Sequence, residues 1–85
     1  MKVTIQIHEY DRVEGVRGTW IDGFEIEVRV DDGDVVIVAN KEGLLSLAAN
    51  LATLAQDNVP SSHHFHLDPG YGVELNSNSL ILERK

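Results

Sequence analysis

The residues of this 85-residue chain whose types and spacing could do chemistry together lie between positions 63 and 68, which read His-His-Phe-His-Leu-Asp. On a strand, side chains alternate between two faces, so His64, His66 and Asp68 would share one face. Two imidazoles and a carboxylate can bind zinc or non-haem iron. The same alternation is typical of an ordinary strand whose Phe and Leu face the core. Because no further ligand can be placed, we expect no metal and no cofactor, and a metal-binding or metal-dependent enzyme domain stays as the alternative.

Other catalytic patterns are weaker. The serines at positions 61, 62, 77 and 79 lie in turn-like stretches without a nucleophile elbow, and there is no cysteine. The glycines between positions 69 and 72 are not followed by the helix and the Gly-Lys-Ser of a phosphate loop. Glu25 and Glu27 alternate with apolar residues, as on the solvated face of a strand. The sequence therefore predicts no catalytic residue and a protein that is not an enzyme.

An acidic stretch from residue 22 to residue 34 holds six acids and one base, Arg29. Such a patch is either a solubilising surface or a means of attracting a basic partner. Trp20 lies at its edge and would be a core residue or an exposed anchor for a partner. The candidate partner-binding residues are Trp20, Glu25, Glu27, Asp31, Asp32 and Asp34.

Alternation of apolar and polar residues predicts half-buried strands at 3–8 and 24–30. An Asp-Asp-Gly-Asp turn then leads to four consecutive β-branched residues at 35–38, a pattern typical of an interior strand covered on both faces. Two further strands are predicted at 63–67 and 80–83.

A helix is predicted from Asn40, a good N-cap, to the Val-Pro break at 59–60. Leu47, Leu51 and Leu54 recur at helical spacing and are expected to face the sheet. Phe24, Ile26, Val28 and Ile37 are expected to join them in the core. The opposite face carries no charge between residues 43 and 56, which suggests that a second subunit covers it.

These elements predict an α+β fold in which one amphipathic helix packs on a mainly antiparallel sheet of five or six strands, in the order β-β-β-α-β-β. The length suits a single domain over residues 1–85. The net charge of −7 argues against nucleic acid and anionic membranes as partners. The beginning of the chain alternates rather than forming a continuous apolar run, so no secretory signal is expected and the predicted location is the cytoplasm.

Several motifs resemble a family of bacterial proteins classed as predicted immunity proteins of polymorphic toxin systems. They are Asn-Lys-Glu-Gly-Leu at 40–44, the leucine-rich helix, Val-Pro at 59–60, His-Phe-His-Leu-Asp at 64–68 and Leu-Ile-Leu-Glu at 80–83. The resemblance covers residues 35–84 and is most specific at the start of the helix. It implies a protein that binds and neutralises a co-encoded toxin in the cytoplasm, and it implies no catalytic residues.

The first hypothesis is therefore an immunity protein whose partner is a toxin domain. The second is the metal site at His64, His66 and Asp68, and the third is a homo-oligomeric subunit that binds a small ligand. A chain with net negative charge would attract a basic toxin, which agrees with the first hypothesis.

Overall fold

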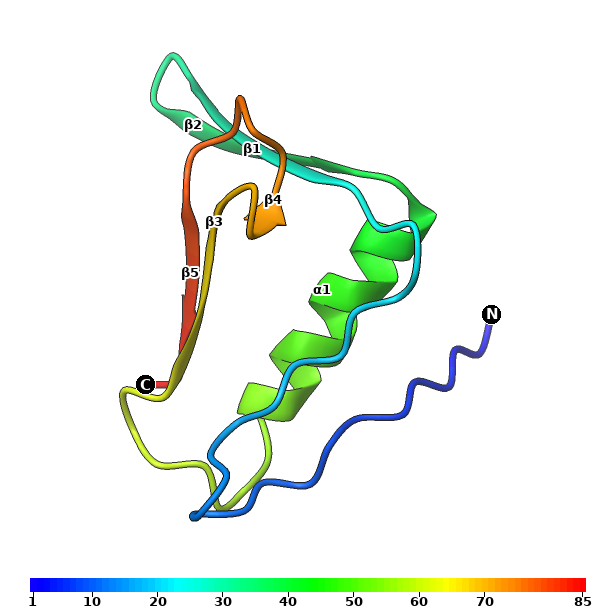
Figure 1. Ribbon diagram of the computed structural model, residues 1–85, viewed down its shortest axis with the longest axis vertical. Coiled ribbons are helices and arrows are strands. Elements are labelled where there is room, and N and C mark those ends of the chain that lie inside the picture. The colour runs from blue at the N-terminus through cyan, green and yellow to red at the C-terminus, as the bar shows by residue number, and fades with distance from the viewer.

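One helix and five strands make up the fold of this protein, and the computed structural model describes all residues from 1 to 85 (Figure 1). Strands β1 (Ile26–Asp31) and β2 (Asp34–Ala39) form an antiparallel hairpin. Helix α1 (Lys41–Leu54) follows directly. Strand β3 (His64–Pro69) then pairs with the short β4 (Gly72–Val73) in parallel and with β5 (Leu80–Glu83) in antiparallel fashion. Helix α1 lacks the length and apolar character that a membrane crossing requires.

The predicted α+β class, with one helix and mainly antiparallel strands, is confirmed. The order of the elements differs by one strand from the prediction, since it is β-β-α-β-β-β, and the hydrogen-bonded ladders are divided into one pair and one group of three. The added strand is the two-residue β4, and the missing one is the strand expected at 3–8.

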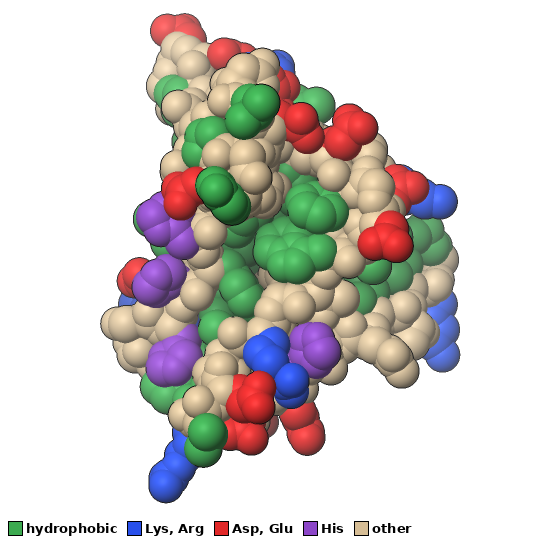
Figure 2. Space-filling model, viewed as in Figure 1, with side chains coloured by type: hydrophobic (Ala, Val, Ile, Leu, Met, Phe, Trp, Pro, Cys, Tyr) green, Lys and Arg blue, Asp and Glu red, His purple; other side chains and the backbone are tan.

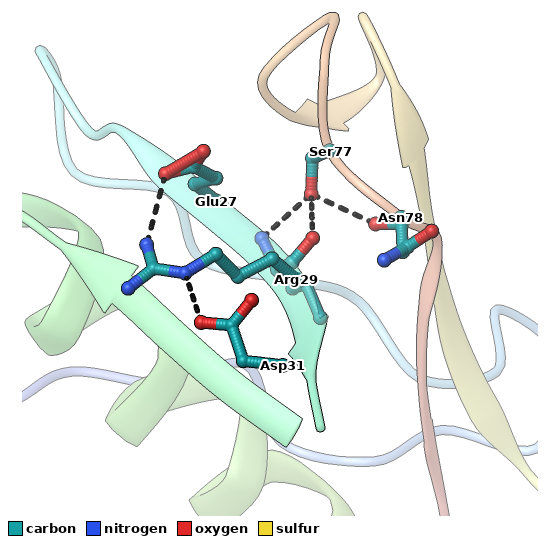
Figure 3. A network of polar contacts seen from close by, with 6 residues as sticks. Glu27, Arg29, Asp31, Ser77 and Asn78 are labelled. Carbon is teal, nitrogen blue, oxygen red and sulfur yellow. Dashed lines mark hydrogen bonds and ion pairs between the residues drawn. The ribbon is translucent and has the colours of Figure 1, made fainter. Parts of the chain in front are cut away.

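Loop residues that follow β4 connect the two ladders by bonding to the second edge of β1. The amide of Glu74 donates to the carbonyl of Ile26 over 2.8 Å, and the amide of Asn78 donates to the carbonyl of Val28 over 2.8 Å. Between them, the Ser77 hydroxyl accepts from the Val28 amide at 2.6 Å, as Figure 3 shows. This edge of β1 is thereby occupied, and the alternating residues 3–8 pair with no strand.

The core lies between the hairpin, the helix and β3. It consists of Ile26 and Val28 from β1, Leu47 from α1, Leu67 from β3 and Val73 from β4. Ile26 and Val28 are two positions apart because alternate residues of a strand face one side. Phe24, Ala39, Phe65, Leu80 and Leu82 pack around this cluster.

The leucine face that was predicted to pack on the sheet is buried only in part. Leu47 and Leu54 are buried as expected, but Leu51 is 52% exposed, so its predicted place in the core is wrong. The polar face of the helix next to them is buried as well: Ser46, Asn50 and Thr53 have no exposed surface.

This polar helix face is covered by the protein's own N-terminal segment, which runs along the helix in the opposite direction (Figure 1). The amide of Ile21 donates to the Ser46 hydroxyl at 2.8 Å, and the amide of Thr19 donates to the Asn50 side-chain oxygen at 2.8 Å. Near the other end of the helix, the amide of Tyr10 donates to the side chain of Gln56 at 2.9 Å. The expectation that a second subunit covers this face is therefore wrong. The side chains are small and uncharged because they hydrogen-bond an irregular backbone.

The interior position predicted for residues 35–38 is also wrong. Strand β2 lies at the edge of the two-stranded hairpin, and Val35 and Ile37 are 66% and 42% exposed. A run of β-branched residues indicates a strand, but it does not indicate whether neighbouring strands lie on one side of it or on both.

Candidate protein-binding surface

The histidine cluster lies where the alternation predicts. His64, His66 and Asp68 share the outer face of β3, with Phe65 and Leu67 turned toward the core. His66 Nε2 is 3.0 Å from Asp68 Oδ1, and the same oxygen accepts a hydrogen bond from the Ser79 hydroxyl at 2.8 Å.

His64 is turned elsewhere, with its Nδ1 3.1 Å from the carbonyl oxygen of Ser62. No three histidine, aspartate or glutamate side chains are placed so that they could hold a metal ion together. The local bonds of this face therefore orient surface side chains, and no observation favours the metal hypothesis.

The acidic residues of the hairpin fall into two groups. On the outer face of β1, Arg29 lies between Glu27 and Asp31, with nitrogen–oxygen distances of 3.7 and 2.7 Å (Figure 3). The hydrogen bond to Asp31 and the charges of Asp31 and Glu27 raise the pKa of the Arg29 guanidinium. This arginine offsets part of the charge that the sequence count suggested.

At the tip, Asp32 and Gly33 both have positive φ, 51° and 86°, which makes a tight two-residue turn. Asp32 and Asp34 are exposed there. The tip carboxylates line none of the hollows of the surface.

Apart from the acidic residues, a group that includes three aromatic side chains forms a hollow around Trp20. The rings of Trp20 and Phe24 lie 5.2 Å apart between centroids and are inclined by 32°. With His66, Tyr71 and Gly72 they line a hollow of about 420 Å³. Trp20 is 38% exposed and Tyr71 is 82% exposed. Trp20 therefore lies outside the core cluster, and its role as an anchor for a partner stays a prediction.

Two smaller hollows continue from this one toward the hairpin. Phe24 and Gly72 also line a hollow of about 250 Å³ that reaches Glu74 and the exposed Leu75. Glu74 in turn lines a groove of about 150 Å³ with Glu25 and Glu27. On the face seen in Figure 2, hydrophobic side chains gather near the middle, and acidic side chains border them above and to the right.

We call the area lined by these three neighbouring hollows the aromatic–acidic surface. Its defining side chains are Trp20, Phe24, Glu25, Glu27, Tyr71 and Glu74.

Tyr71 is held in place by a tight turn. Its amide donates to the Asp68 carbonyl at 2.7 Å, and its carbonyl accepts from the Asp68 amide at 3.1 Å. Gly72 has φ +111°, and a Cβ atom there would lie 3.0 Å from the Cγ of Leu67. Only glycine combines this backbone conformation with such close packing, so the turn presents the tyrosine ring on a fixed backbone.

Of the candidate residues predicted from the sequence, Trp20 lines the aromatic hollow and Glu25 and Glu27 line the acidic groove, and their role in binding stays a prediction. Phe24 packs against the core as expected and also borders the aromatic hollow, whereas Tyr71 and Glu74 were not among the predicted residues. The signal for Tyr71 was present, because an aromatic residue between two glycines of a turn has few ways to be buried.

A further hollow, of about 410 Å³, lies between the last turn of α1 and β5 and is lined by Leu51, Leu54 and Ile81 among others. It has no cluster of acidic or aromatic side chains. It accounts for the exposure of Leu51, which faces this hollow and not the core.

Fold and surface together define a small α+β protein with an aromatic hollow beside an acidic groove. Comparison with known families is more specific. The model of the Immunity protein 32 family matches residues 34–85, which is more than half of the chain, and the protein belongs to that family. No curated protein and no solved structure matches the chain. The matched range includes Tyr71 and Glu74, whereas Trp20, Glu25 and Glu27 precede it.

Proposed function

We propose that this protein is the immunity partner of a co-encoded toxin and neutralises it in the cytoplasm by direct binding, without catalysis. Membership of an immunity protein family supports the general role. We propose further that residues 1–85 act as one domain, because the N-terminal segment is hydrogen-bonded along the helix.

The aromatic–acidic surface is the proposed toxin-binding site. The observation that carries this proposal is that three neighbouring hollows share lining residues: Phe24 and Gly72 line the hollow around Trp20 and the next one, and Glu74 lines that one and the groove of Glu25 and Glu27. Binding energy in protein interfaces concentrates on a few aromatic and arginine side chains in hollows that water leaves on binding. Carboxylates around such a centre attract a basic partner and select it over an acidic one.

The partner of this surface is a toxin domain with a basic contact region. Its arginine or lysine side chains would lie over the tryptophan and tyrosine rings and reach the three glutamates. The net charge of −7 adds a long-range attraction of the same sign.

The test is a kinetic binding measurement with the toxin domain encoded beside this gene. Tyr71→Ala and Trp20→Ala are each expected to speed dissociation by at least about tenfold, since a central aromatic anchor contributes roughly 2 kcal/mol or more. The double reversal Glu25→Lys/Glu27→Lys is expected to slow association about tenfold at low salt and less at high salt, because salt screens charges over about 8–10 Å.

A matched control is available at the hairpin tip. The double reversal Asp32→Lys/Asp34→Lys changes the net charge by the same amount but lies outside the hollows, so its effect on association should be clearly smaller. Equal effects of the two reversals would mean that only net charge matters. Unchanged dissociation in both aromatic variants would place the toxin on another surface, and no binding by the wild type would refute the immunity role with this toxin.

A further inference from the structure

The outer edge of β2 has backbone groups that no other part of the chain satisfies. The two-residue turn makes Asp31 and Asp34 the closing pair of the hairpin, so the amides and carbonyls of residues 34, 36 and 38 point toward β1. The amide of Asn40, which donates to the Glu25 carbonyl at 3.2 Å, continues this alternation. The backbone groups of Val35, Ile37 and Ala39 therefore point away from β1, and no third strand lies there.

This edge is unprotected in its side chains as well. Proteins usually shield an edge strand with a lysine, a proline, a bulge or a short length. Residues 35–39 are Val-Val-Ile-Val-Ala, with no charge and no proline, and all six residues of β2 pair with β1 in register without a bulge. The outer strands of the other ladder are shorter: β4 has two residues, and β5 has four and ends in Glu83. The edge of β2 is thus suited to being covered by another strand.

A second copy of this chain fits the edge by symmetry. In a two-fold antiparallel pair of β2 strands, Ile37 lies opposite Ile37 of the second copy, and Val35 lies opposite Ala39 of the second copy. This register joins only residues whose backbone groups point outward on both strands. It also places the exposed Val35 and Ile37 side chains of both copies in one apolar row on the same face of the sheet.

Charge favours the same arrangement. Antiparallel pairing places Lys41 of one copy beside the turn that carries Asp32 and Asp34 of the other, and it holds the two acidic tips at opposite ends of the joined sheet. Parallel pairing would bring the two tips together, where like charges repel. We propose that two copies of this protein associate through β2 in this antiparallel register to form one continuous sheet.

The proposal does not depend on the toxin-binding role. The pairing uses the outer edge of β2, whereas Trp20, Tyr71 and Glu74 lie on the far side of β1, next to β4 and the loop after it. The dimer would therefore leave the aromatic hollow around Trp20 and Tyr71 free in both copies, whereas the groove of Glu25 and Glu27 borders the pairing strand, since Val38 and Ala39 also line it. A single strand edge buries less area than the roughly 1,200–2,000 Å² of a stable interface, so the association should be weak, with a dissociation constant of about 10 μM.

Sedimentation equilibrium of the full-length chain tests the association. The wild type, of 9.4 kDa, should approach twice its mass at about 300 μM and return to the monomer mass at about 1 μM, given such a dissociation constant. Ile37→Lys should remain monomeric at both concentrations, because it places two ammonium groups opposite each other. Leu51→Lys is the matched control, since it charges a similarly exposed apolar side chain on the helix, and it should associate like the wild type.

Hydrogen exchange tests the register independently of any variant, and so answers the case in which Ile37→Lys does not fold. The amides of Val35, Ile37 and Ala39 should be protected at high concentration and exchange rapidly on dilution. The amides of Val36 and Val38, which bond to β1, should be protected at both concentrations. A wild type that is monomeric at 300 μM, a loss of association in Leu51→Lys as large as in Ile37→Lys, or exchange that is independent of concentration would each overturn the proposal.

Discussion

Asn40 joins the start of the helix to the start of the hairpin through one side chain. Its Oδ1 accepts from the amide of Gly43 at 2.8 Å, the usual N-cap bond, and also from the amide of Glu25 at 2.9 Å. Its Nδ2 donates to the carbonyl of Gly23 at 2.9 Å. Replacing Asn40 with alanine removes all three bonds at once.

The cost of Asn40→Ala follows from these contacts. Loss of an N-cap typically costs about 1 kcal/mol. The other two bonds are partly exposed, so each should contribute toward the lower end of the roughly 0.5–1.5 kcal/mol of an intramolecular hydrogen bond. The expected loss in free energy of unfolding is about 2–3 kcal/mol. Asn40→Asp keeps the acceptor and places a negative charge at the helix N-terminus, so it should cost about 1 kcal/mol or less.

Urea denaturation followed by far-ultraviolet circular dichroism measures both variants. The comparison separates the hydrogen bond to Gly23 from the N-cap bond. Aspartate and asparagine are similar N-caps, but only asparagine has an amide group that donates to the Gly23 carbonyl. A loss below about 1 kcal/mol for Asn40→Ala would show that only the cap bond matters. If Asn40→Asp lost as much free energy of unfolding as Asn40→Ala, the two hydrogen bonds that Oδ1 accepts would not be stabilising ones.

Three further predictions concern the core, the helix and the histidine face. Gly43→Ala should destabilise the protein by more than about 1 kcal/mol in denaturant melts despite alanine's better helix propensity, because its Cβ would overlap the carbonyl oxygen of Glu25. Leu67→Ala should cost about 2–5 kcal/mol, since Leu67 is buried in the core, whereas Leu51→Ala should cost under about 1 kcal/mol; a reversed order would contradict the packing. Calorimetric titration of the tag-free protein with zinc should show no binding tighter than about micromolar, roughly −8 kcal/mol, and tight binding that His66→Ala abolishes would contradict this.

Local patterns were enough to predict the elements that are stabilised locally. The hairpin follows from the alternation before Asp32 and Gly33 and the β-branched run after them, because a tight turn with two positive φ angles selects these two residue types. The helix begins where Asn40 can cap it, and the strand at 64–69 places its histidines and its apolar residues on the two faces that the period requires.

The same patterns failed where the partner of an element decided the outcome. Residues 3–8 alternate as a strand does, yet the edge of β1 is occupied by residues 74–78. The β-branched residues of β2 indicate a strand but do not specify its neighbours. The uncharged side chains of Ser46 and Asn50 indicated that this helix face would be covered, but only the fold showed that the cover is the chain's own N-terminal segment.

The candidate site divides in the same way. Sequence alone indicated a run of carboxylates with a tryptophan at its edge, either in the core or exposed, because amino-acid type and strand period are local properties. It also indicated the family, through motifs at 40–44 and 64–68. That Tyr71 and Glu74 stand beside Trp20 and Glu25 was decided by tertiary structure, since about fifty residues separate the two groups in the chain. The loop carrying Tyr71 and Glu74 reaches β1 only because the free edge of that strand accepts hydrogen bonds from it, and no local pattern specifies which edge a distant loop will satisfy.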